Sequence, residues 1–458
     1  MLNMALYTMI SYDKVKGTEM LLSFRVENFR SIRDPQTLSM RRAGGGVKSR
    51  LAIEDDLAGG DVSPVAVVFG ANASGKSTVL DALERVKWLV RYSAQFDPSL
   101  PLVTDPFLLD DLSRSSPFAC AVSFTTTGRE FHYSFSIQAG LVQTEELKET
   151  VQGPARRATR VLFTRQADGE SRITVAPTLQ GPKKNIIAAT RPNTLFLSKA
   201  AQENFRPLLD VYEWFVDPGT QDDPWVGRSW MSDPTADLYK TDAAFRPWLV
   251  NLLAQADLGV TDVSLVPAFT KPSRVSFQIR STDGSDDQDQ PAQKNHRDAW
   301  LPELQHRSVP GAPTAIPWLN ESRGTQALWH LASDIYLALR SGRPLLIDEL
   351  SDLHPLVVRE VLRTFQSREK NPENAQLIFT SNDATLLGSW GGDGYMLDRD
   401  QIWFTEKDFA SGKTSLVPLT DFDPRRDEDT EKWYLQGRYG AVPSVGNLID
   451  PYLGTDSG

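Results

Sequence analysis

The sequence has a single cysteine, Cys120, which excludes an internal disulfide and a cysteine-rich metal site. Because Cys120 lies in the apolar run 118–124, we predict that it is a core residue. No apolar run approaches the ~20 residues that a helix needs to cross a membrane. Residues 1–20 also lack a basic segment followed by an apolar core, so they do not form a secretory signal. These absences predict a cytoplasmic protein of bacterial type without a membrane partner.

Positive charge is also scarce, since 49 Lys and Arg residues stand against 59 Asp and Glu residues, for a net charge of −10. A chain with this balance is not coated with nucleic-acid-binding charge. One segment departs from it: residues 156–191 carry eight basic residues against Asp168 and Glu170, a local charge of +6. We leave two interpretations of this basic strip open, a contact with nucleic acid and the solvated face of a β-hairpin.

The length of 458 residues exceeds one ordinary domain, and 40% hydrophobic residues suffice for a large core. No internal repeat is present. We predict an N-terminal extension (1–19), a first head lobe (20–195), a mixed insert with a polar surface loop at 282–290 (196–300), and a second head lobe (301–458).

Hydrophobic periodicity predicts both strands and helices along the chain. The first lobe contains a β-rich part, with strands predicted at 22–29, 118–124, 130–137 and 141–151. The insert has helical patterns at 208–215 and at 243–256, where Pro247 interrupts the pattern, and strand patterns at 262–266 and 274–279. The second lobe alternates helix and strand, at 326–340, 345–349, 355–366 and 375–380. Such alternation predicts an α/β fold whose sheet is largely parallel at its centre.

One loop matches the phosphate-binding pattern G-x-x-x-x-G-K-[ST], and it stands between an apolar run of strand length and a helical segment. We expect its backbone N–H groups and the helix N-terminus to surround the β- and γ-phosphates of ATP. Lys76 adds a positive charge there, and the Ser77 hydroxyl can ligate Mg²⁺. The predicted nucleotide-binding residues of this loop are Gly70, Ala71, Asn72, Ala73, Ser74, Gly75, Lys76, Ser77 and Thr78.

A second apolar strand ends in two carboxylates, Asp348 and Glu349. We predict that Asp348 holds Mg²⁺ and that Glu349 polarises the water that attacks the γ-phosphate. The other interpretation is a solvated acidic turn at the end of a strand. Lys76 and Asp348 are 272 residues apart, more than a minimal phosphate-loop domain needs. The intervening chain is rich in Pro and Gly and lacks heptads, so we predict a globular insert rather than a coiled coil.

Several segments together resemble known ATPases. Residues 24–32, 69–78, 321–325 and 346–355 resemble the RecF/OLD-like ABC ATPases. Residues 400–407 and 434–443 look like the AbiL/RloB-partner group of bacterial ATPases, which is related to the PARIS ATPase. The resemblance implies a P-loop NTPase fold of the ABC-head type, with a β-rich lobe and a globular α+β insert. It also implies an ATPase subunit of a phage-defence or abortive-infection operon that works with a separate effector, often a TOPRIM-type nuclease.

The same resemblance assigns residues 321–325 to a signature motif. Ser322 and Gly324 would contact the γ-phosphate held by a second subunit, so that ATP closes a homodimer or a higher homo-oligomer through its heads. The alternative is a plain helix N-cap by Ser322. One position departs from the family, because Asn382 stands where a His commonly contacts the γ-phosphate. Asn donates hydrogen bonds but carries no proton, so we expect Asn382 to assist a slow hydrolysis.

Three functions remain open at the level of the sequence. The leading one is a nucleotide-switched ATPase that senses infection and controls a partner. The alternative is a RecF-like DNA-repair ATPase that binds DNA directly through the basic strip at 156–191. In the third, the chain is itself a nuclease, although we interpret Asp398 and Asp400 as a turn at the end of a strand rather than a TOPRIM motif. The acidic balance and the C-terminal resemblance favour the first.

Overall fold

The computed structural model describes most of the chain, namely residues 19–42, 53, 60–152, 157–168, 170–216, 233–256, 259–268, 300–308, 312–350, 353–389, 394–425 and 428–443. The chain divides into two compact units, Met1–Asp217 with Ala338–Gly458 (unit 1) and Pro218–Leu337 (unit 2). The predicted extension, apart from its last residue, the polar loop at 282–290 and the strand at 274–279 lie outside the described residues. No helix in the described part of the chain is long and apolar enough to span a bilayer.

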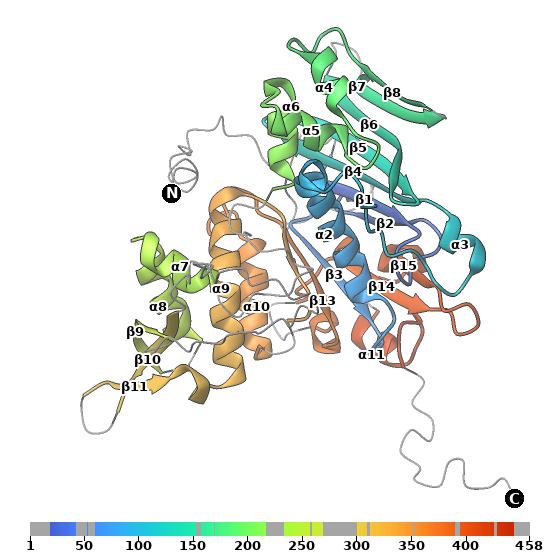
Figure 1. Cartoon of the computed structure of the whole chain (residues 1–458). Coiled ribbons are helices and arrows are strands. Elements are labelled where there is room, and N and C mark those ends of the chain that lie inside the picture. Colours follow the sequence, from blue (N-terminus) through green and yellow to red (C-terminus); the bar gives the residue numbers. More distant parts are fainter. Residues whose placement is uncertain are drawn as a thin grey trace, which may run out of the picture. The chain divides into compact units, whose positions relative to one another are not determined.

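Unit 1 contains a five-stranded sheet in the order β12-β13-β3-β14-β15 (Figure 1). The strands are β12 (Leu345–Ile347), β13 (Leu377–Ser381), β3 (Val65–Gly70), β14 (Ile402–Lys407) and β15 (Thr414–Pro418). The first four run parallel, and β15 pairs antiparallel with β14. Every residue of the central strand β3 is buried, as expected for a parallel strand covered on both faces. The predicted parallel centre is therefore confirmed.

The second sheet of unit 1 is antiparallel, in the order β2-β1-β4-β5-β6-β7-β8. Its strands are β1 (Leu21–Glu27), β2 (Gln36–Ser39), β4 (Phe118–Thr126), β5 (Arg129–Gln138), β6 (Leu141–Gln152), β7 (Arg157–Asp168) and β8 (Glu170–Val175). Buried and half-buried residues alternate strictly along most of β4 and β5, which is the signature that predicted these strands. Cys120 is buried in β4, as predicted.

Helices of unit 1 accompany both sheets. The longest is α2 (Lys76–Tyr92), which begins directly after the phosphate-binding loop and runs beside β3 in Figure 1. The other helical elements are η1 (Ser93–Gln95), α3 (Asp111–Ser115), α4 (Lys183–Ala189), α5 (Phe196–Gln202), α6 (Arg206–Trp214), α10 (Pro355–Phe365), η3 (Ala384–Leu387), η5 (Arg399–Gln401), η6 (Leu419–Phe422) and α11 (Thr430–Leu435).

Unit 2 combines helices with the three-stranded antiparallel sheet β11-β10-β9. Its elements are α7 (Pro234–Thr241), α8 (Phe245–Gln255), β9 (Val260–Pro267), β10 (Trp300–His306), β11 (Thr314–Pro317), η2 (Trp318–Asn320) and the first part of α9 (Arg323–Ser341). Its core includes Phe245, which packs on Tyr336. The interruption predicted at Pro247 is wrong, because Pro247 lies in the first turn of α8, where a helix tolerates the missing N–H.

The unit boundaries differ from the predicted ones at 195 and 300. Helices α5 and α6 belong to unit 1, because Trp214 at the end of α6 stacks on Phe124 of the antiparallel sheet and Phe215 meets the same ring edge to face. The start of α9 belongs to unit 2, where Trp329 donates a hydrogen bond from Nε1 to Asp233 at 2.8 Å. Neither contact has a short-range sequence signal, so the composition of the chain did not reveal the boundaries.

Candidate nucleotide site

The predicted phosphate-binding loop connects the end of β3 to the start of α2. Two of its residues have left-handed backbone, Ala73 at φ 63° and Gly75 at φ 105°. No side-chain hydrogen bond caps α2 at Gly75, so its first N–H groups are available to an anion. The Lys76 side chain folds back over the loop, and its ammonium donates hydrogen bonds to Gly70 O at 2.9 Å and Ala71 O at 3.1 Å. The backbone thus forms a cradle with the Lys76 charge at its centre.

The predicted carboxylates follow β12 and are exposed. Strand β13 lies between β12 and β3, and its residue Thr380 binds both the Asp348 carboxylate and the Glu349 backbone. The Thr380 hydroxyl donates to Asp348 Oδ1 at 2.7 Å and accepts a hydrogen bond from Glu349 N at 2.9 Å. Glu349 has a positive φ of 62°, a strained conformation for a residue with a side chain. Thr380 was not predicted from the sequence. The only feature that could have indicated it is a hydroxyl side chain near the end of the neighbouring strand.

The phosphate loop and the carboxylates act on each other electrostatically. Burial lowers the pKa of the Lys76 ammonium, whereas the charges of Glu349 and Asp348 raise it. Asn382, which follows β13, donates from Nδ2 to Glu349 Oε1 at 2.8 Å. The structure therefore brings together four residues that the sequence predicted for one site. It places Asn382 against the predicted general base.

The donor set suits a hard cation. Ser77, in the first turn of α2, is exposed, and Asp348 supplies a carboxylate, so both offer the oxygen ligands that Mg²⁺ prefers. Among the described residues, no group of three or more His, Cys, Asp and Glu side chains forms a metal site by itself.

The turn between β1 and β2 also reaches α2, which the sequence analysis did not predict. Arg30 has a positive φ of 49° and forms an ion pair with Asp81, one turn after Ser77. Burial raises the pKa of Asp81, Arg30 lowers it, and the charge of Asp348 raises it further. Next to Arg30, Ser31 Oγ lies 3.2 Å from Thr78 Oγ1. The segment 28–32 is thus part of the surroundings of the nucleotide loop.

The predicted signature residues lie in unit 2. Ser322 accepts a hydrogen bond at its Oγ from Thr325 N at 3.1 Å, which is the bond of a helix N-cap. Ser322 is exposed and Gly324 is half-buried. Glu321 is held by His306 through a 2.8 Å contact between Nε2 and Oε1. The N-cap interpretation is therefore realised in the fold, and the contact with a second subunit stays a prediction.

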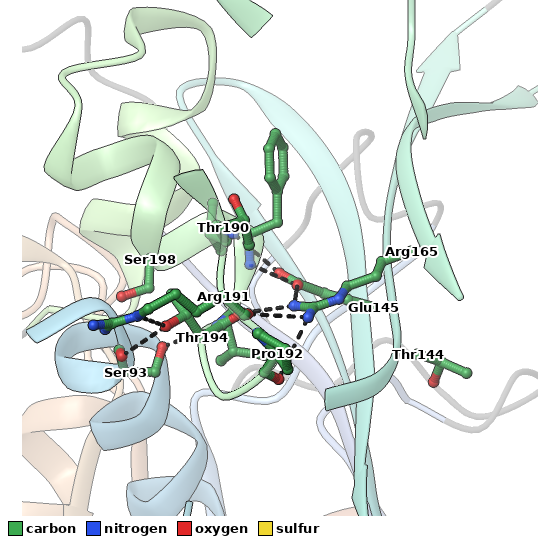
Figure 2. Close-up of polar contacts among 12 residues, drawn as sticks. Ser93, Thr144, Glu145, Arg165, Thr190, Arg191, Pro192, Thr194 and Ser198 are labelled. Atoms are coloured by element: carbon green, nitrogen blue, oxygen red, sulfur yellow. Dashed lines mark hydrogen bonds and ion pairs between the residues drawn. The ribbon is translucent and has the colours of Figure 1, made fainter. Parts of the chain in front are cut away.

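Much of the basic strip serves the antiparallel sheet. Arg157 and Arg160 form ion pairs with Glu130 and Glu149 across strands. Arg165 is fully buried, and Figure 2 shows it between Glu145 and the segment around Arg191 and Thr194. There the Arg165 guanidinium donates to Thr194 O at 2.6 Å.

Glu145 faces Arg165 and accepts hydrogen bonds from the first N–H groups of α5, Phe196 N and Leu197 N. Burial raises the pKa of Glu145, and the charge of Arg165 lowers it. Arg191 turns away and donates to Ala94 O and Phe96 O, directly after α2. These contacts join β6, β7, α5 and the end of α2. They give most of the described basic residues a structural task, and nucleic-acid binding by the strip stays a prediction.

A protein-family profile described as "AAA domain, putative AbiEii toxin, Type IV TA system" matches residues 65–388. The match covers more than half of the chain, so the chain belongs to this family. It runs from β3 to the residue after η3 and thus includes the phosphate loop, the carboxylates and Asn382. The predicted P-loop ATPase fold is confirmed, and the match does not distinguish the AbiL/RloB-partner group within it.

Solved structures of similar fold include heads of SMC proteins. The SMC head domain from Thermotoga maritima is 11% identical at a TM-score of 0.35, covering 87% of this chain and 98% of that one. The Smc head domain with a coiled coil and joint from Pyrococcus yayanosii is 9% identical at a TM-score of 0.40, covering 92% and 100%. No curated protein sequence matches the chain.

Proposed function

We propose that this member of the AAA family binds ATP with Mg²⁺ and hydrolyses it slowly. The observation that carries the proposal is the convergence of Lys76, Asp348, Glu349 and Asn382 at the carboxyl ends of β3, β12 and β13. A bare phosphate loop would support nucleotide binding alone. The carboxylates opposite it supply a metal ligand and a proton acceptor, which are what hydrolysis needs in addition.

Each residue has a role that follows from its contacts. The N–H groups of residues 71–77 and the Lys76 ammonium bind the phosphates of ATP. Ser77 and Asp348 hold Mg²⁺, which neutralises developing phosphate charge when it is bound. Glu349 accepts the proton of the attacking water. Asn382 orients the Glu349 carboxylate through its 2.8 Å hydrogen bond, and because its amide does not titrate it cannot itself carry a proton.

We further propose that the chain is the nucleotide-switched subunit of an anti-phage, abortive-infection type system. The description of its family as part of a toxin–antitoxin system supports this, as does the resemblance of residues 400–407 and 434–443 to defence ATPases. In this proposal, Ser322 and Gly324 cap the γ-phosphate held by a second copy, and two ATP molecules close a homodimer or a pair of heads in a larger homo-oligomer. The closed state controls a separate effector, such as a TOPRIM or RloB-like nuclease.

The test has a biochemical and a cellular arm. Isothermal titration should show Mg²⁺-dependent ATP binding that Lys76→Ala abolishes, while Lys184→Ala, at an exposed lysine of α4, behaves as the unmodified chain. Cells that carry the chain with its neighbouring genes should resist phage, and Lys76→Ala should remove the resistance. Normal ATP binding by Lys76→Ala would overturn the site. Normal binding without protection against any phage, but with ATP-dependent binding to DNA ends, would replace the defence role by a DNA-repair role.

A further inference from the structure

The hairpin formed by β14 and β15 contacts the phosphate loop through two threonines, Thr405 and Thr414. Thr405 on β14 and Thr414 on β15 are 0% and 1% exposed. Thr405 Oγ1 lies 2.6 Å from Ser74 Oγ and donates to Phe69 O at 3.3 Å. Since a hydroxyl has one proton and a carbonyl oxygen only accepts, the Ser74 hydroxyl donates to Thr405. The side chain of the loop residue Ser74 thus ends in the sheet rather than at the phosphate face.

Thr414 holds the same residue by its backbone. The Thr414 hydroxyl donates to Ser74 O at 2.8 Å and lies 2.9 Å from Ser31 Oγ, which in turn lies 3.2 Å from Thr78 Oγ1. Thr414 N also donates to Ser31 O at 2.7 Å. Ser74 is therefore bound on two sides, and a chain of hydroxyls continues to the first turn of α2.

The two motif glycines show how tightly the threonines fit. A Cβ at Gly70 would lie 2.4 Å from Thr405 Oγ1, and a Cβ at Gly75 would lie 2.3 Å from Thr414 Oγ1. Both distances are far below a van der Waals contact, and both threonines are almost fully buried. The loop therefore needs glycine at both positions for the threonines to approach, besides the positive φ that Gly75 adopts.

We propose that Thr405 and Thr414 are positioning residues of the phosphate loop, which fix Ser74 so that the loop is shaped for phosphate before ATP arrives. The inference rests on the proposed ATP-binding function and deepens it. A loop ordered in advance loses less conformational entropy on binding, so the two hydroxyls set the affinity for ATP. They touch phosphate neither before nor during hydrolysis, so they support ground state and transition state equally. Their loss raises KM and leaves kcat in place.

The test compares Thr→Ser with Thr→Ala at each position, because neither change adds atoms and only Ser keeps the hydroxyl. Thr405→Ala and Thr414→Ala should raise the Kd for ATP and the KM about tenfold, equivalent to about 1.4 kcal/mol, with kcat within about twofold. Thr405→Ser and Thr414→Ser should retain most of the affinity. The matched control is Thr125→Ala, a buried threonine of β4 whose Oγ1 accepts from Met20 N at 3.1 Å. It should lower the Tm and leave the Kd for ATP unchanged.

A double-mutant cycle isolates the contact between Ser74 and Thr405. Ser74→Ala should raise the Kd several-fold, and adding Thr405→Ala should then change it by less than about twofold, since the partner hydroxyl is already gone. Because the cycle uses only Ser74 and Thr405 variants, it still tests the positioning role if Thr414→Ala fails to fold. Alanine variants that bind ATP as the unmodified chain does, with only a lower Tm, would overturn the positioning role alone. An unmodified chain that does not bind ATP would overturn the proposed function, and this inference with it.

Discussion

Thr380 offers the sharpest test of how the sheet arranges the hydrolytic residues. We expect Thr380→Val to preserve β13, because a branched apolar side chain suits a buried strand and Thr380 is 1% exposed. The substitution removes the donor to Asp348 Oδ1 and the acceptor for Glu349 N. Both lost bonds belong to the segment that carries the predicted metal ligand and general base, so the effect falls on catalysis.

The magnitude follows from the kinds of bond that are lost. A hydrogen bond to a charged group contributes roughly 1.5–3 kcal/mol, and the lower end applies here because Asp348 is exposed. The left-handed backbone of Glu349 adds strain of about 1–2 kcal/mol that the bond to Thr380 helps to hold. If the catalytic orientation of Asp348 and Glu349 loses about 1.4–2.8 kcal/mol of stabilisation, kcat falls by about ten- to a hundredfold. We expect the midpoint of the Mg²⁺ titration to rise as well, since Asp348 loses its support.

The assay is steady-state ATP hydrolysis at saturating ATP with a titration of Mg²⁺, together with ATP binding by calorimetry. Thr380→Ser is the matched control, because it keeps the hydroxyl and should keep most of kcat. ATP affinity of Thr380→Val in the absence of Mg²⁺ should stay near that of the unmodified chain, since Lys76 and the loop are unchanged. A Thr380→Val variant with unaltered kcat and Mg²⁺ midpoint would refute the role of β13 in fixing the Asp348 carboxylate and the Glu349 backbone.

Three further predictions concern the same site. Glu349→Gln should keep ATP and Mg²⁺ bound while it slows hydrolysis by about 10²–10⁴-fold, and a normal rate in a single-turnover assay would place the general base elsewhere. Asn382→His should keep or raise the rate of ATP hydrolysis, because a ring N–H can still donate to Glu349; loss of activity would show that the amide is a working adaptation. Ser322→Arg should leave ATP affinity near normal but block head closure and hydrolysis, and mixing it with Lys76→Ala should restore at most one intact site per dimer. Normal hydrolysis by Ser322→Arg, or no recovery in mixtures that still dimerise, would reduce residues 321–325 to a helix cap.

The parts of the site that the sequence predicted are those that short-range patterns specify. The phosphate loop is a local motif of eight residues, 70–77, that joins a buried strand to an amphipathic helix, and the carboxylates directly follow an apolar strand. Asn382, by contrast, was predicted only through the family resemblance, which expects a His at this position after the next strand. The residues that fix these groups were not predicted. They lie on other strands, and no motif in the adjacent sequence distinguishes them. Ser74 and Thr405 are 331 positions apart, and Ser74 and Thr414 are 340 apart.

Such pairs depend on strand order and register, which the sequence pattern leaves open. Thr405 reaches the loop because β14 pairs parallel with β3 and sets Thr405 opposite Gly70. Thr380 reaches the carboxylates because β13 inserts between β12 and β3. A one-residue slip in either pairing would turn these hydroxyls to the other face of the sheet. Other threonines in strands, such as Thr125 and Thr126 of β4, would have looked equally suitable before the register was known.

The structure explains why two segments that the family resemblance singled out, 24–32 and 434–443, accompany the nucleotide loop. The N-terminal segment 24–32 contributes Ser31 and Arg30, which contact the start of α2 through Thr78 and Asp81. The C-terminal segment 434–443 covers the central strands, since Tyr434 packs on Phe69 and stacks on Phe404, 6.1 Å and 5.4 Å between ring centroids. Phe69 directly precedes Gly70. Residues 24–32 and 434–443 therefore both pack against the phosphate loop, the start of α2 or strand β3. Ending the chain at Trp433 should impair ATP binding before it unfolds the antiparallel sheet, because residues 434–443 contribute no strand to that sheet.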